Sequence, residues 1–184
     1  GLTNVTGMEN FFKKTFLEQN FSNITPEVFV VATQLNSSRK VIFGPRDSGA
    51  QTDYNPYVAY YNDIPMYKAV SASMAVPGIF EPYAIENPSS GERIYYIDGE
   101  VRETLSAHIA QDIEMDLAVI SNTWVPYKYQ PEAGSITRRG VVPVLFQALN
   151  QSMEQKIQKF RQDTERTELT LEYLKLKAIN FGLN

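Results

Sequence analysis

Two short apolar runs constrain the fold of this chain more than any other feature. Residues 27–33 (EVFVVAT) and 116–121 (DLAVIS) are almost continuously apolar and rich in β-branched side chains. Such short runs are typical of buried strands rather than of helices. Segments with helical spacing alternate with them, which predicts an α/β fold whose sheet is covered on both faces.

Local patterns predict the remaining elements. Turn residues at 36–38 and 87–92 favour two strand pairs. Their expected strands, besides 27–33, cover residues 40–43, 82–85 and 93–97. Apolar spacing predicts helices at 8–17, 64–74 and 103–112.

The apolar pattern changes at Val141. From there apolar residues recur every three or four positions, which predicts a long amphipathic helix. Residues 169–176 fit both the helical and the strand period, and their assignment stays open. We expect an α/β domain over 1–140 and a C-terminal helical segment over 141–184 that packs on it.

Composition excludes several classes of protein. With 184 residues, 43% of them hydrophobic, the chain is long enough for one domain or most of one. The net charge is −4 and no basic stripe is visible, which argues against a nucleic-acid partner. The sequence contains no run of about 18 apolar residues, so it predicts no transmembrane helix.

Cysteine and histidine usage limits the chemistry further. The chain has no cysteine and a single histidine, His108, which excludes disulfides, thiolate metal sites and multi-histidine metal sites. We expect no metal and no cofactor. The absence of cysteine and of a visible signal peptide favours a soluble location, cytoplasmic or peripheral to a membrane, although the compartment itself stays unknown.

One carboxylate stands out by its position. The apolar residues 94–97 of the expected strand run directly into Asp98 and Gly99, which places the carboxylate of Asp98 at the tip of a strand. Open α/β sheets carry their working groups at such tips. Ordinary turn chemistry of an Asp-Gly pair is the competing interpretation.

A nucleophile to serve Asp98 is missing from the sequence. No G-x-S-x-G motif is present. The phosphate-binding motifs G-x-x-x-x-G-K-[ST] and G-x-G-x-x-G are absent from the sequence as well. A triad of Asp98, His108 and either Ser71 or Ser73 has no supporting motif, so a structural histidine is the better interpretation. The acidic residues 112, 114 and 116 bracket a turn that lacks the ligand number and glycine of a calcium loop.

The sequence around Asp98 resembles the patatin-like phospholipases. Residues 69–85 (AVSASMAVPGIFEPYAI) and 94–101 (IYYIDGEV) are similar to the family's small-residue helix, Pro-Gly-Ile-Phe segment and Asp-Gly strand. Residues 27–44 resemble its earlier strand pair, and 116–122 the strand after the Asp-Gly motif. The resemblance implies a three-layer α/β sandwich with a mainly parallel sheet.

The resemblance also implies an activity. Such proteins are serine acyl hydrolases that use a Ser-Asp dyad on lipid or ester substrates, with Asp98 here as the general base and Gly99 as the turn residue of the motif. Val76, Ile79 and Phe80 are candidates for the wall that binds the acyl chain, together with the tyrosine-rich segment 57–67. The glycine-rich oxyanion loop and the serine precede this region in the family, so we expect an upstream segment or a second chain to supply them.

One departure from the family pattern leaves an alternative open. Glu100 stands where the family usually has glycine or alanine, and a second carboxylate beside Asp98 disfavours ionisation in a buried site. The alternative is therefore a non-catalytic scaffold or binding protein with the same fold. A third interpretation makes the C-terminal helix an element that docks on a partner or a membrane surface, although its mixed charges argue against direct lipid binding.

Overall fold

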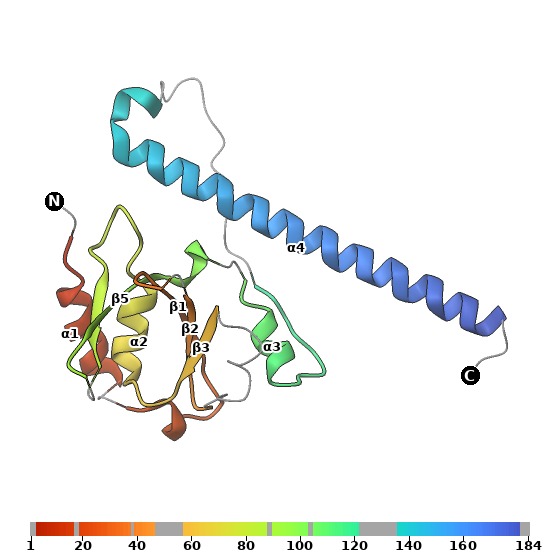
Figure 1. Cartoon of the computed structure of the whole chain (residues 1–184), viewed down its shortest axis with the longest axis horizontal. Coiled ribbons are helices and arrows are strands. Elements are labelled where there is room, and N and C mark those ends of the chain that lie inside the picture. The colour runs from red at the N-terminus through yellow and green to blue at the C-terminus, as the bar shows by residue number, and fades with distance from the viewer. Residues whose placement is uncertain are drawn as a thin grey trace.

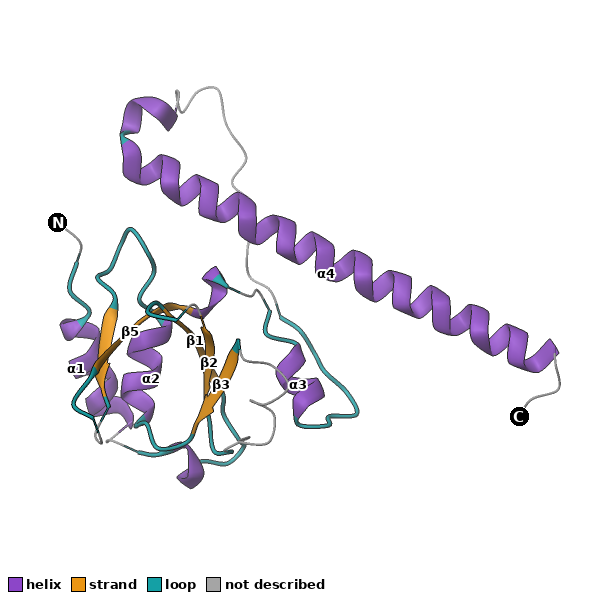
Figure 2. Ribbon diagram, in the orientation of Figure 1, coloured by secondary structure: helices purple, strands orange, loops and turns teal. Residues whose placement is uncertain are grey.

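The computed structural model describes residues 3–16, 19–37, 39–46, 57–87, 90–102, 105–121 and 136–180. A five-stranded sheet lies at its centre, and a long helix extends away from it (Figures 1 and 2). The strands are β1 (Val30–Gln34), β2 (Arg39–Phe43), β3 (Val58–Tyr61), β4 (Tyr83–Glu86) and β5 (Arg93–Asp98). The helices are α1 (Thr6–Phe16), α2 (Met66–Ser73), α3 (His108–Asp112) and α4 (Val141–Asn180), with 3-10 turns η1 (Phe21–Asn23), η2 (Gly99–Val101) and η4 (Ile136–Arg139).

The sheet is mixed, which corrects the expectation of a mainly parallel one. Its order is β3-β2-β1-β5-β4, and only the β2–β3 pair is parallel. The two strand pairs expected from their turn residues, β1–β2 and β4–β5, are confirmed, and the structure shows both to be antiparallel. A connection of only a few residues reverses the chain direction, so each of these turns joins antiparallel neighbours. Parallel neighbours need a longer crossover connection, which these turns do not provide.

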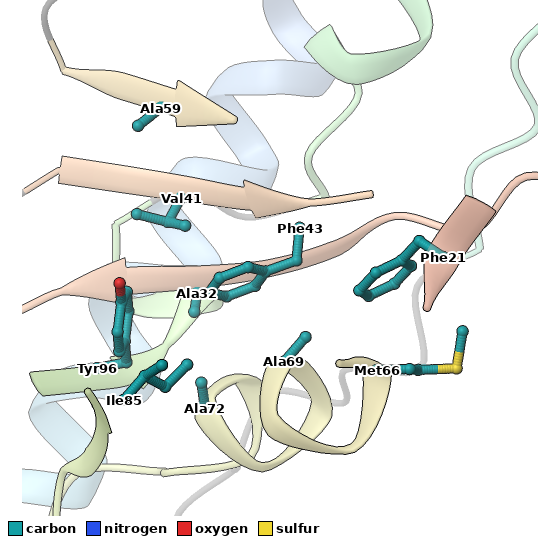
Figure 3. Packing of buried hydrophobic residues seen from close by; sticks show 10 residues of the cluster. All are labelled: Phe21, Ala32, Val41, Phe43, Ala59, Met66, Ala69, Ala72, Ile85 and Tyr96. Carbon is teal, nitrogen blue, oxygen red and sulfur yellow. The ribbon is translucent and has the colours of Figure 1, made fainter. Parts of the chain in front are cut away.

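The hydrophobic core lies between the sheet and α2. Successive side chains of a strand point to opposite faces, and Ala32, Phe43 and Tyr96 all face α2 (Figure 3). The rings of Phe43 and Tyr96 meet edge to face with their centroids 5.6 Å apart. The small residues Ala69 and Ala72, fully buried on α2, let the helix axis approach the strands closely. Helix α1 packs against α2 in turn.

The opposite face of the sheet carries polar side chains. Lys40 pairs in register with Thr33, and both point away from α2. Lys40 is only 1% exposed, and its Nζ lies 3.1 Å from Nδ1 of His108. On β3, the hydroxyl of Tyr60 donates a hydrogen bond to Asp112 at the end of α3. The three-layer arrangement as a whole stays a prediction.

Most expected elements form, with shifted ends. The helices expected at 8–17 and 64–74 correspond to α1 and α2, and the strand at 27–33 corresponds to β1. Strand β3 was not predicted; its residues lie in the tyrosine-rich segment 57–67, which was proposed only as part of the acyl-binding wall. The helix expected from 103 begins only at His108, since Leu105 (φ 73°) and Ser106 (φ 44°) have left-handed backbone conformations that no α-helix accepts.

The prediction of a strand at residues 116–121 is wrong. The segment forms no strand with any described residue, and Leu117 and Val119 are 79% and 88% exposed. β-propensity describes how well a residue fits a pleated, half-buried surface. No strand of the described sheet pairs with this segment to supply that surface.

The expected C-terminal helix is confirmed as a single helix, α4, of 40 residues. It follows Gly140, whose φ of +95° turns the chain between η4 and α4. Ile157 is buried, whereas residues 161–177 are exposed and extend beyond the sheet (Figure 1). Within the described ranges, no helix combines the length and apolar character needed to cross a membrane. A domain boundary at residue 140 stays a prediction.

The position of Phe43 in the core predicts that its removal strongly destabilises the fold. This side chain is 0% exposed and contacts both the sheet and its aromatic neighbours. We expect Phe43→Ala to lower the free energy of unfolding by about 3–5 kcal/mol. The matched control is Phe11→Ala, which removes a ring that is 63% exposed and should cost less than about 1 kcal/mol. Urea denaturation of both variants makes the comparison; equal losses would contradict it.

Candidate active site

Asp98 lies at the point where β5 ends and η2 begins. It pairs with Ala32 of β1, and its amide donates a hydrogen bond of 3.1 Å to the carbonyl of Ala75, just after α2. The carboxylate caps η2 by accepting a hydrogen bond of 2.9 Å from the amide of Glu100. The backbone and side chain of Asp98 are therefore fixed by three neighbouring segments.

Gly99 is required by the closeness of β1. A Cβ atom built on Gly99 would lie 2.6 Å from the carbonyl oxygen of Val31, far inside the normal contact distance. Only the absence of a side chain lets η2 begin directly against the backbone of β1. The Asp-Gly pair is thus more than a flexible turn, because its glycine allows the carboxylate to stand this close to the sheet.

A pocket of about 370 Å³ opens beside Asp98. One part of its wall is polar and consists of Asp98, Glu100 and two serines, Ser73 of α2 and Ser106. The rest is Gly99 and apolar side chains at the end of α2 and around the start of β1; these apolar residues are Phe29, Val30, Val31, Val70 and Met74. The pocket therefore places a carboxylate next to a surface that suits a hydrocarbon chain.

Burial makes both carboxyl groups of the pocket more basic than usual. It raises the pKa of Asp98, while the hydrogen bond from the amide of Glu100 lowers that pKa. Burial also raises the pKa of Glu100, and the nearby charge of Asp98 adds to this rise. A hydrogen bond with the backbone of Leu105 and the charges of Lys156 and Lys40 oppose it. Desolvation is the dominant cause in both cases.

The three residues proposed for the acyl-binding wall lie elsewhere. Val76, Ile79 and Phe80 form the turn that follows α2, where the carbonyl of Val76 accepts hydrogen bonds from the amides of the other two. None of them lines the pocket of Asp98. Their role in binding an acyl chain stays a prediction.

The imagined Ser-His-Asp triad is not assembled. His108 contacts Lys40 and does not line the pocket of Asp98. Ser71 is fully buried in α2 and donates a hydrogen bond of 2.8 Å to the carbonyl of Tyr67. Ser73 does line the pocket. Across the described ranges, no three His, Cys, Asp or Glu side chains gather as they would around a metal ion.

Comparison with known protein families identifies the chain. The family model described as patatin-like phospholipase matches residues 1–110. The chain belongs to the patatin-like phospholipase family. No match was found among curated proteins. The family match covers the sheet, α2, Asp98 and its turn, and it supports a lipid-directed hydrolase in general.

Several residues of this patatin-like site carry no signal in the sequence. Phe29, Val70 and Met74 look like ordinary core residues, and only the fold turns them toward Asp98. Ser106 enters the pocket because two successive residues, Leu105 and Ser106, have positive φ. Neither is a glycine or an asparagine, so nothing in the sequence indicates the left-handed backbone there.

The raised pKa of Glu100 predicts a pH-dependent stability difference. A carboxyl group with a raised pKa in the folded state favours folding below its unfolded pKa, and this contribution is lost as pH rises through the folded pKa. Glu100→Gln removes the titration. We therefore expect the melting temperature of Glu100→Gln to rise relative to that of the wild type as pH rises from about 3.5 to 7.

The control for this prediction is Glu92→Gln, which alters an exposed carboxylate in the β4–β5 hairpin. This variant should show no comparable pH-dependent gain. Thermal unfolding across the pH series measures both differences, and a constant gap between Glu100→Gln and the wild type would contradict the prediction.

Proposed function

We propose that the protein is a serine acyl hydrolase for lipid or ester substrates and that this chain supplies Asp98 as the general base of a Ser-Asp dyad. The observation that carries the proposal is the half-buried carboxylate of Asp98 at a strand tip, whose pKa is raised by burial and which faces a pocket with an apolar wall. Membership of the patatin-like family supports the reaction class.

The proposed chemistry is an acyl transfer in two halves. Asp98 accepts the hydroxyl proton of the serine while the serine oxygen attacks the ester carbonyl, and the proton then passes to the leaving alcohol. Water repeats the sequence on the acyl-enzyme and releases the carboxylic acid. A carboxylate of ordinary basicity removes a hydroxyl proton poorly, so a raised pKa of Asp98 favours this role.

The serine and the oxyanion donors come from outside these residues in this proposal. The chain has no G-x-S-x-G motif. An upstream segment of the same protein, or a second chain, provides the nucleophile and completes the three-layer sandwich. The exposed apolar side chains of Leu117 and Val119 support such a partner, because exposed apolar surface commonly marks an interface.

The apolar wall of the pocket suits the acyl chain. Val70 on α2, Met74 directly after α2 and Phe29 before β1 provide hydrocarbon surface next to Asp98. Val76, Ile79 and Phe80 would extend this wall only if the completed domain brings the substrate over the end of α2. A peripheral contact with a membrane would deliver such a substrate.

A non-catalytic scaffold is the second candidate, and one observation favours it. Glu100 lines the same pocket as Asp98, and its negative charge would oppose the ionised base that the mechanism needs. The upstream sequence discriminates between the two candidates. An intact glycine-rich loop with G-x-S-x-G favours the hydrolase, and its absence favours the scaffold.

Replacing Asp98 tests the assignment of the base. In the longest natural chain that contains these residues, Asp98→Asn should lower kcat for a p-nitrophenyl ester by about 100-fold or more, because general-base catalysis contributes 10²–10⁴-fold. Asp63→Asn, a change of the same kind at an exposed position, should leave kcat within about twofold. Full activity of Asp98→Asn would remove Asp98 from the mechanism.

Replacing the exposed apolar pair tests the partner. Leu117→Ser combined with Val119→Ser should change the unfolding free energy of the 184-residue chain by less than about 0.5 kcal/mol, since both side chains are exposed there. In the longer natural chain the same pair should cost about 3 kcal/mol if a partner segment covers it. Equal, small effects in both chains would show that the surface stays uncovered.

A further inference from the structure

A lysine of the long C-terminal helix holds the turn that follows Asp98. The Nζ atom of Lys156 donates hydrogen bonds to the carbonyl oxygens of Val101, at 2.6 Å, and of Arg102, at 3.1 Å. These residues lie 55 and 54 positions earlier in the chain. The contact therefore joins α4 to the segment that carries the candidate base, and α4 and η2 are neighbours in space.

The turn η2 is fixed at both of its ends. At its start, the carboxylate of Asp98 accepts the hydrogen bond from the amide of Glu100. At its end, the amide of Arg102 donates a hydrogen bond of 3.2 Å to the carbonyl of Gly99, and the carbonyls of Val101 and Arg102 follow at the open end of the turn. The ammonium group of Lys156 satisfies both of these carbonyls, as basic side chains do at helix C-termini.

We propose that Lys156 is a positioning residue for Asp98: it anchors the far end of η2 and thereby fixes the direction of the Asp98 carboxylate at the near end. This inference rests on the proposed function of Asp98. Lys156 is absent from the lining of the Asp98 pocket, so it acts through the turn rather than on the substrate. Helix α4, which lies beyond the region matched by the family model, becomes part of the site.

The positive charge of Lys156 also acts on the turn, because it lowers the pKa of Glu100. Besides burial, four groups act on the carboxyl of Glu100: Asp98 of β5, the backbone of Leu105, Lys156 of α4 and Lys40 of β2. Lys156 and Lys40 are the cations among them. Replacing Lys156 with an uncharged residue should therefore raise the pKa of Glu100, in addition to freeing the turn.

Three substitutions separate positioning from a merely structural role. Lys156→Met keeps much of the side-chain volume and removes both the donors and the charge, whereas Lys156→Arg keeps both. Lys159→Met makes the same change as the first variant at an exposed position of the same helix, one turn away. The variants are made in the longest natural chain that contains these residues. Steady-state kinetics with a p-nitrophenyl ester and thermal unfolding are measured for each.

We expect Lys156→Met to lower kcat by about 10- to 100-fold, because a misplacement of a reacting group by about 1 Å costs up to 10²-fold. KM should change by less than about twofold, since the pocket wall is untouched. Lys156→Arg should recover kcat to within about threefold of the wild type, and Lys159→Met should match the wild type. An unchanged kcat in Lys156→Met, or an equal loss in Lys159→Met, would overturn the proposal.

A second measurement tests the contact between Lys156 and the turn and does not depend on enzymatic activity. Carboxyl ¹³C NMR follows the titration of Glu100 in the same variants, and its midpoint should rise in Lys156→Met but not in Lys156→Arg or Lys159→Met. If the wild type hydrolyses no ester, the proposed function fails. An unmoved midpoint in Lys156→Met would show that the ammonium group of Lys156 is not held beside the turn, which overturns the present inference independently of activity. If Lys156→Met does not fold, a loss of kcat beyond tenfold in folded Lys156→Arg overturns the proposal.

Discussion

The structure around Asp98 depends on one backbone hydrogen bond, from the amide of Asp98 to the carbonyl of Ala75. It joins the end of β5 to the end of α2, and it forms only because α2 lies very close to the sheet. The buried small residues Ala69 and Ala72 permit that approach. A larger side chain at either position would push α2 outward and separate the pocket wall on α2 from the carboxylate on β5.

The same close packing sets the chemistry of the pocket. Burial raises the pKa of Asp98 and of Glu100, because a carboxylate loses solvation in an apolar wall. A basic carboxylate is useful to a general base, but two of them in one pocket destabilise the folded state at neutral pH. The positive charges of Lys156 and Lys40, from α4 and β2, offset part of this cost. Elements far apart in the sequence thus meet at one site.

Sequence patterns predicted the parts of this molecule that local chemistry determines. The turn residues at 36–38 and 87–92 correctly indicated two strand pairs, and the apolar spacing from Val141 correctly predicted α4. Asp98 was correctly placed at a strand tip. The lining residue Met74 and the anchor Lys156 were not predictable, because only the packing of α2 and α4 brings them to the turn.

The two apolar runs show why strand prediction has a physical limit. Residues 27–33 and 116–121 have nearly the same pattern, yet the first forms β1 and the second forms no strand in the described chain. A strand needs neighbours for its backbone hydrogen bonds and for its side chains. Val30 and Ala32 face the core beside α2, whereas Leu117 and Val119 face solvent. A run so apolar is typical of a strand covered on both faces, so a strand that pairs with residues 116–121 is what the proposed partner segment would have to supply.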